Sequence, residues 1–120
     1  MLVSVDDPTR PITRIPHERE FKQWTKRLTP GEYDSIINEI DCKIDSGEVH
    51  TSSWMPGGNW AGTPFENIYE IACMENPAAA AECFGIFVWV VMMKRSEKWS
   101  FGRYENDGMP IKGITYFRLP

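Results

Sequence analysis

The sequence predicts a single α+β domain, with about four helices packed on one face of a small antiparallel sheet of about three strands. Two patterns predict this class. Apolar residues recur with a helical period through most of the chain, and after Ser96 they change to the aromatic-rich alternation typical of strands. The length of 120 residues and the hydrophobic content of 42% match one ordinary globular domain, so we expect residues 1–120 to share one core.

The chain opens with a segment that has no periodicity. Residues 1–15 contain two prolines and scattered charges, so we expect an extended N-terminal arm that either packs along the domain or frays. Pro16 suits the first turn of a helix. A first helix is predicted over residues 16–28, because three apolar residues recur on one face: Phe21, Trp24 and Leu28.

Two capping boxes predict the next helix starts. In Thr29-Pro30-Gly31-Glu32 the hydroxyl of Thr29 can accept from the backbone of Glu32, whose carboxylate can reach back. Gly47 can end this second helix, and its apolar face is expected to consist of Tyr33, Ile36, Ile37, Ile40 and Ile44. Thr63-Pro64-Phe65-Glu66 repeats the motif and predicts a third helix over residues 63–75.

A fourth helix is predicted from Asn76-Pro77 to about Arg95, where Lys94 and Arg95 complement the helix dipole. Its apolar run over residues 83–93 would rise about 16 Å, well short of a bilayer core of about 30 Å, so we expect a buried helix and no membrane span. The β-branched valines leave a strand open for part of this run.

This fourth helix is apolar on two opposite faces. One face is enough for packing in a domain and carries Phe84, Phe87, Val88 and Val91. The other face predicts a homodimer contact and carries Ile86, Trp89 and Met93. The alternative is that the helix is threaded between the sheet and the other helices.

Three segments are predicted strands. Residues 48–54 alternate, and residues 98–105 and 111–119 are aromatic-rich segments joined by a turn, so they should form an antiparallel hairpin. Residues 55–62 contain a proline and three glycines, which prevent regular structure, and are predicted to form a loop.

This loop and the strand before it are the best candidate for a ligand site. Gly57 and Gly58 let backbone amides approach a ligand, and the flanking tryptophans could form walls. The residues predicted to bind a ligand are His50, Ser52, Trp54, Gly57, Gly58, Trp60 and, nearby, Arg103. The alternative is that the tryptophans plug the end of the core while the glycines turn the chain.

No coherent catalytic set is visible. His50 with Ser52 or Ser53 is kept as a small-hydrolase alternative, although residues two apart on a strand share a face without necessarily meeting. The other histidine, His17, is expected to face water, and Asp41 with Asp45 to be a solvated pair. Neither metal-ligand spacing nor a phosphate-binding glycine motif is present, so we expect no metal and no cofactor.

Charge and cysteine content bound the partners and the compartment. The net charge of −4 divides into about +2 for residues 1–28, −9 for residues 29–93 and +3 for residues 94–120, which argues against wrapping by nucleic acid. The dispersed cysteines, Cys42, Cys73 and Cys83, favour a reducing compartment, and the first residues lack signal-peptide features, so a cytoplasmic protein is expected.

The last hairpin keeps single-stranded nucleic-acid binding as an alternative, because aromatic platforms beside cations stack on bases. The residues concerned are Trp99, Phe101, Arg103, Tyr104, Lys112, Tyr116, Phe117 and Arg118. No RNP sequence supports this interpretation.

Four stretches carry a resemblance: Trp54-Met55-Pro56-Gly57, Trp60-Ala61-Gly62-Thr63-Pro64-Phe65, Phe84-Gly85-Ile86-Phe87-Val88-Trp89 and Trp99-Ser100-Phe101-Gly102-Arg103-Tyr104. Over residues 49–118 the chain resembles small uncharacterised bacterial proteins, including some carried on mobile gene cassettes. The resemblance implies a bacterial, intracellular and accessory protein and implies no catalytic residue. The expected function is therefore a soluble, self-associating binding or interaction module, with an enzyme as the less favoured alternative.

Overall fold

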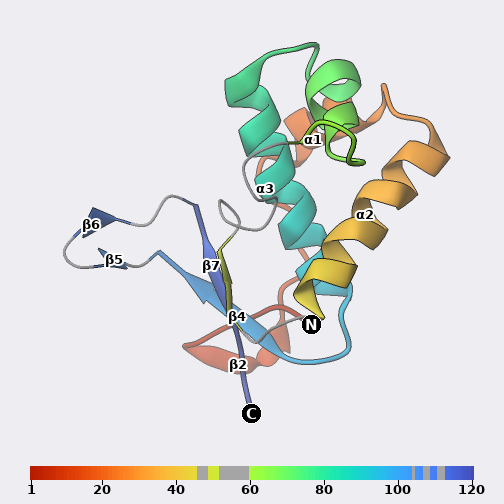
Figure 1. Cartoon of the computed structure of the whole chain (residues 1–120). Helices are drawn as coiled ribbons and strands as arrows, with labels where there is room; N and C mark the ends of the chain where they lie inside the picture. The colour runs from red at the N-terminus through yellow and green to blue at the C-terminus, as the bar shows by residue number, and fades with distance from the viewer. Residues whose placement is uncertain (46–48, 52–59, 104, 107–108, 111–112) are drawn as a thin grey trace.

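The structure, a computed structural model, describes residues 1–45, 49–51, 60–103, 105–106, 109–110 and 113–120 (Figure 1). These residues confirm the α+β class. Four helical segments form the larger part of the fold: α1 (Glu18–Thr25), α2 (Pro30–Ile44), the π-helix η1 (Ile68–Ala72) and α3 (Pro77–Lys94). In Figure 1 the helices lie together above the sheet, with α3 in contact with each of the others.

The predicted starts of α2 and α3 are confirmed. The Thr29 hydroxyl accepts from the Glu32 amide at 3.1 Å, and the Glu32 carboxylate accepts from the Thr29 amide at 2.8 Å, which completes the capping box. At α3 the Asn76 side chain accepts from the amide of Ala79 at 3.1 Å. The apolar run is helical throughout, which removes the strand alternative for its valines.

The third predicted helix, over residues 63–75, differs in type and length from the helical segment that forms there. Only a short π-helix forms, and the second capping box does not. The Thr63 hydroxyl donates to the carbonyl of Trp60 at 2.7 Å, while the Glu66 carboxylate accepts from the amide of Gly62 at 2.7 Å. Both side chains of the motif are thus hydrogen-bonded to the backbone of residues that precede them, and they do not cap a helix. The segment ends in two left-handed residues, Met74 and Glu75, with φ of 53° and 64°.

Seven short strands in the described residues form three antiparallel sheets. The prediction of a single sheet of about three strands is therefore right only in part. One sheet has the order β3-β7-β4, from Val49–Thr51, Thr115–Arg118 and Trp99–Gly102. The pairing of β4 with β7 confirms the predicted hairpin. A small ribbon of β5 (Glu105–Asn106) and β6 (Met109–Pro110) lies beyond the ends of these two strands (Figure 1).

The N-terminal arm packs along the domain. Its strands β1 (Val3–Ser4) and β2 (Asp7–Pro11) pair with each other as the third sheet. Leu2 forms a parallel bridge to Trp99, and the Ser100 hydroxyl donates to the carbonyl of Val3 at 2.9 Å. Leu2 and Val3 are fully buried, so this segment contributes to the core.

Each face of α3 packs against a different part of the chain. Phe87 meets Phe21 of α1 and Tyr33 of α2, with ring centroids 4.9 and 5.3 Å apart. Trp89 stands edge-on to Phe101 of β4 at 4.8 Å. The helix is long and apolar enough to cross a membrane by length and composition, yet 56% of that stretch is buried inside the fold, which is typical of a core helix.

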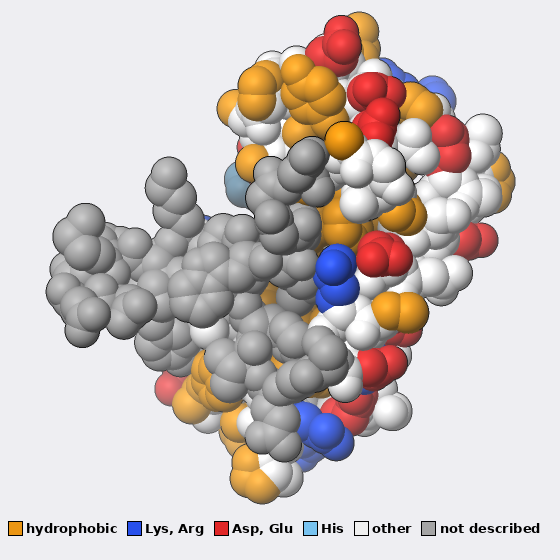
Figure 2. Space-filling view, in the orientation of Figure 1, with side chains coloured by type: hydrophobic (Ala, Val, Ile, Leu, Met, Phe, Trp, Pro, Cys, Tyr) orange, Lys and Arg blue, Asp and Glu red, His pale blue; other side chains and the backbone are white. Residues whose placement is uncertain are grey.

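The central position of α3 also explains why the residues of the predicted dimer face are apolar. Ile86 and Trp89 are 4% and 9% exposed within the single chain, and Met93 is half-buried. These residues offer little surface to a second copy, and the threaded alternative describes α3. Self-association through them stays a prediction. On the visible surface, acidic side chains are scattered over the helical part of the molecule with few basic ones between them (Figure 2).

Candidate functional site

One pocket opens beside α3 where that helix has no side chain. We call it the Gly85 pocket; its volume is about 390 Å³. It is formed by the start of α1, the middle of α3, the end of β4 and the residues before β7. Its lining residues are Pro16, His17, Ala81, Glu82, Gly85, Ile86, Trp89, Arg103, Gly113 and Ile114.

Gly85 accounts for the opening. A β-carbon built on this residue would meet no described atom within 4 Å, apart from its chain neighbours and the backbone of its own helix. Glycine in a helix interior costs roughly 1 kcal/mol relative to alanine. The glycine is therefore not required by close contact with another element, and the space beside it is open.

Trp89 forms a fixed apolar wall of the pocket. Its indole nitrogen donates to the backbone carbonyl of Arg14 at 3.0 Å. Its ring is also held edge-on against Phe101. Because the one donor of the indole is used within the fold, the ring presents carbon surface to the cavity.

Three charged or titratable side chains lie at the pocket. The His17 Nε2 atom is 3.8 Å from Glu82 Oε1, and both side chains are about half exposed. His17 caps α1 with a left-handed φ of 49°, a conformation that costs energy for a residue with a β-carbon. Arg103 is exposed and forms no ion pair with any described side chain.

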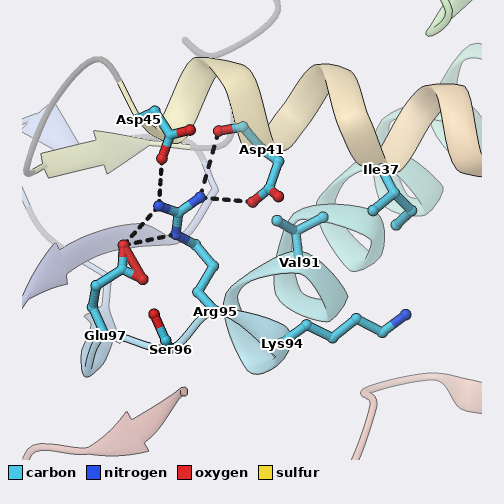
Figure 3. Close-up of a pocket in the computed structure, with 8 residues that line it drawn as sticks. All are labelled: Ile37, Asp41, Asp45, Val91, Lys94, Arg95, Ser96 and Glu97. Atoms are coloured by element: carbon cyan, nitrogen blue, oxygen red, sulfur yellow. Dashed lines mark hydrogen bonds and ion pairs between the residues drawn. The ribbon is translucent and has the colours of Figure 1, made fainter.

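A second pocket, of about 490 Å³, lies between the ends of α2 and α3, and we call it the Arg95 pocket (Figure 3). The guanidinium of Arg95 forms ion pairs with three carboxylates. The N···O distances are 2.6 Å to Asp41, 2.5 Å to Asp45 and 2.6 Å to Glu97. Lys94 points away from this cluster (Figure 3). Asp41 and Asp45 are exposed to solvent, as the sequence predicts, but both also form ion pairs with Arg95, which the sequence does not predict.

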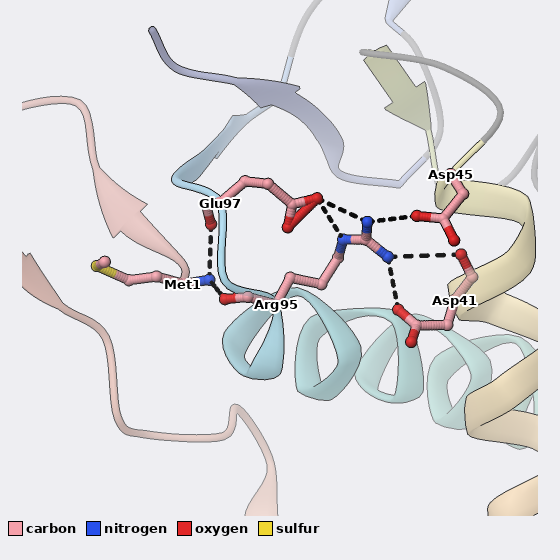
Figure 4. Close-up of polar contacts among 5 residues, drawn as sticks. All are labelled: Met1, Asp41, Asp45, Arg95 and Glu97. Carbon is pink, nitrogen blue, oxygen red and sulfur yellow. Dashed lines mark hydrogen bonds and ion pairs between the residues drawn. The ribbon is translucent and has the colours of Figure 1, made fainter.

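The electrostatics of the Arg95 pocket follow from these contacts. Burial alone would lower the pKa of Arg95, but hydrogen bonds to Glu97, Asp45 and Asp41 raise it above its ordinary value. The same hydrogen bond from Arg95 lowers the pKa of Glu97. The carbonyl groups of Arg95 and Glu97 in turn accept from the nitrogen of Met1, so the cluster also holds the first residue (Figure 4). Within this cluster of Arg95 and three carboxylates each charged side chain has a partner, which indicates a structural junction.

The described residues offer little for catalysis. No group of three or more His, Cys, Asp and Glu that could hold a metal ion occurs among them. Cys73 and Cys83 are buried, and burial raises the pKa of both thiols, which disfavours the reactive thiolate. The Gly85 pocket contains a histidine and a carboxylate but no serine, threonine or cysteine among its lining residues.

Of the residues predicted to bind a ligand, the structure describes the side chains of Trp60 and Arg103 alone. Trp60 is half-buried and packs on Phe84 and Phe65, with ring centroids 5.5 and 6.1 Å apart, whereas Arg103 lies at the Gly85 pocket. The backbone of His50 pairs with Tyr116 in the sheet. The other predicted residues, Ser52, Trp54, Gly57 and Gly58, lie outside the described residues, as does Ser53 of the hydrolase alternative.

The aromatic platforms expected on the last hairpin are largely internal. Trp99 and Tyr116 are 1% and 0% exposed, and Phe101 packs on Trp89, so these rings are not free to stack on bases. Tyr104 and Lys112 lie outside the described residues.

Sequence reasoning missed His17, Glu82 and Gly85 as pocket residues. One signal was present, because Gly85 interrupts an otherwise apolar helical run and glycine inside a helix costs roughly 1 kcal/mol relative to alanine. The contact between His17 and Glu82 has no local signal, since 65 positions separate the two residues in the chain.

No protein-family model matches the chain, and no curated protein or solved structure is similar to it. The resemblance to bacterial proteins of mobile gene cassettes therefore stays a prediction.

Proposed function

We propose that the chain is a binding module that holds a small, largely apolar molecule in the Gly85 pocket. The observation that carries this proposal is the open space at Gly85, on a core helix whose other faces are packed. Pockets for small molecules are concave, mostly apolar and supplied with a few polar groups, and their volumes begin at about 300 Å³. The Gly85 pocket has the apolar wall of Trp89 and Ile86 and the polar groups of His17, Glu82 and Arg103.

Binding is favoured over catalysis for a chemical reason. The described lining residues include a histidine that could accept a proton, but no hydroxyl or thiol that it could deprotonate to form a nucleophile. A binding role needs only the shape and the polar groups that are present.

The test is calorimetric titration with a neutral aromatic probe, 2-naphthamide. We expect saturable binding of one molecule per chain. In Gly85→Leu the new side chain enters the open space, so affinity should fall at least about tenfold, because the cavity volume is filled.

The matched control is Ala78→Leu, which adds the same side chain at an exposed position of α3 outside the pocket. It should leave the affinity unchanged, and thermal unfolding of both variants checks their folding. Absence of binding to the unmodified chain, or equal affinity in Gly85→Leu, would overturn the proposed function.

A further inference from the structure

We propose that the Gly85 pocket selects molecules with one carboxylate on a planar apolar body, and that Arg103 is the residue that recognises the carboxylate. This inference rests on the proposed function and adds the chemical class of the ligand.

The inner part of the pocket favours an apolar body. Trp89 has its indole donor occupied by the Arg14 carbonyl, and Ile86 and Ile114 bring only carbon. A polar group placed against these walls would lose its hydrogen bonds to water without replacement. The volume of about 390 Å³ is near the low end for ligand pockets, which suits a molecule of one or two fused rings.

The charged residues of the pocket differ in whether they lie beside an oppositely charged or titratable side chain of the same chain. Glu82 lies beside His17, at 3.8 Å. Arg103 forms no ion pair with any carboxylate that the structure describes. Arg95, which lines the Arg95 pocket, is by contrast bound by three carboxylates. Within one molecule, therefore, the arginine of the structural junction is saturated and the arginine of the open pocket is available.

A guanidinium binds a carboxylate through two parallel hydrogen bonds, a geometry that an amide or an alcohol does not reproduce. Glu82 limits the charge of the ligand, because a second negative charge in the pocket would be repelled by its carboxylate. The geometry thus favours a monoanion over a phosphate dianion.

The experiment compares four probes with the same ring system: 2-naphthoate, 2-naphthamide, 2-naphthylmethylamine and 2-naphthyl phosphate. Each is titrated calorimetrically into the unmodified chain, Arg103→Gln and Arg19→Gln. Arg19 is exposed on α1, does not line the pocket, and its change removes the same charge. We expect 2-naphthoate to bind at least about tenfold more tightly than 2-naphthamide, since hydrogen bonds to charged groups are worth that much.

In Arg103→Gln the ratio between acid and amide should fall to about one, because the charge-assisted contact is lost. Arg19→Gln should keep the ratio. Equal binding of acid and amide by the unmodified chain, tighter binding of the amine or the phosphate, or a ratio that survives Arg103→Gln would each overturn this inference. If the amide binds and is lost in Gly85→Leu, the proposed function stands even then. If no probe binds, both fail.

Discussion

The Arg95 pocket allows a stability prediction whose magnitude follows from exposure. Arg95→Met keeps the aliphatic stem but leaves three carboxylates facing one another without a cation. The side chains of Arg95 and Glu97 are 12% and 21% exposed, so this pair counts as a charged hydrogen bond worth about 1.5–3 kcal/mol. Asp41 and Asp45 are 49% and 67% exposed, so each adds at most about 1 kcal/mol. We expect a loss of about 2–4 kcal/mol in the free energy of unfolding.

Differential scanning calorimetry and urea unfolding measure this loss. An unfolding entropy of about 2.1 cal/mol/K per residue gives about 0.25 kcal/mol/K for 120 residues, so Tm should fall by about 8–16 °C. The control is Lys94→Met, an exposed neighbour outside the carboxylate cluster, which should change stability by less than about 0.5 kcal/mol. If Arg95→Met were no less stable than Lys94→Met, the cluster would not be a stabilising junction.

Three further predictions concern pH, helix packing and thiol chemistry. Because a hydrogen bond from the guanidinium lowers the pKa of Glu97, its stabilisation is present above the ordinary carboxyl pKa and is lost as pH falls through the lowered one; Tm measured between about pH 5 and pH 3 should fall, and less so in the Arg95 variant. Gly85→Ala should raise stability by roughly 1 kcal/mol in urea unfolding, since its β-carbon meets no atom within 4 Å, and a decrease would show that the space is filled. With a disulfide reagent at pH 8, exposed Cys42 should react rapidly, whereas Cys73 and Cys83, both buried and with raised pKa values, should react only on unfolding; three rapid thiols in the folded chain would contradict their burial.

The helices that the sequence predicts correctly are those with local signals. For α2, the hydrogen bonds that start the helix are made between residues three positions apart, Thr29 and Glu32. For α3, Asn76 caps the helix three residues before the amide that it binds. Such signals need no knowledge of the rest of the fold, and the predicted hairpin of β4 and β7 also depends on neighbouring segments.

The capping-box signal fails before η1 because the side chains of Thr63 and Glu66 bind backbone groups that directly precede them. Thr63 and Glu66 repeat the motif of α2, yet their side chains bind Trp60 and Gly62. At the other end of this segment, the Arg27 guanidinium donates to the carbonyl of Ala72 at 2.7 Å, across 45 positions. A capping box predicts a helix only where its two side chains are free to bind each other.

The candidate site depends even more on long-range contacts. Arg95 lies 54 positions from Asp41, so the ion cluster has no pattern in the sequence. The N-terminal arm joins the fold through Leu2 and Trp99, which an aperiodic segment does not reveal. Arg103 was a predicted binding residue, but its predicted partner Trp60 packs elsewhere on α3.

Gly85 is visible in the sequence as a local feature, but its consequence depends on long-range packing. On a core helix that is apolar on every face, each side chain is expected to fill the space before the element that it meets, as Phe87 does between α1 and α2. A glycine in such a helix is usually explained by the close approach of another backbone. That explanation does not hold for the described part of the chain, because a β-carbon at this position would meet none of its other elements within 4 Å. The helix therefore bears the cost of glycine, roughly 1 kcal/mol, without gaining a packing contact. What the glycine does provide is open space in a pocket that Trp89 and Arg103 also line, and Arg103 forms no ion pair with any described carboxylate. A bound molecule is the occupant that would make use of both the space and the guanidinium.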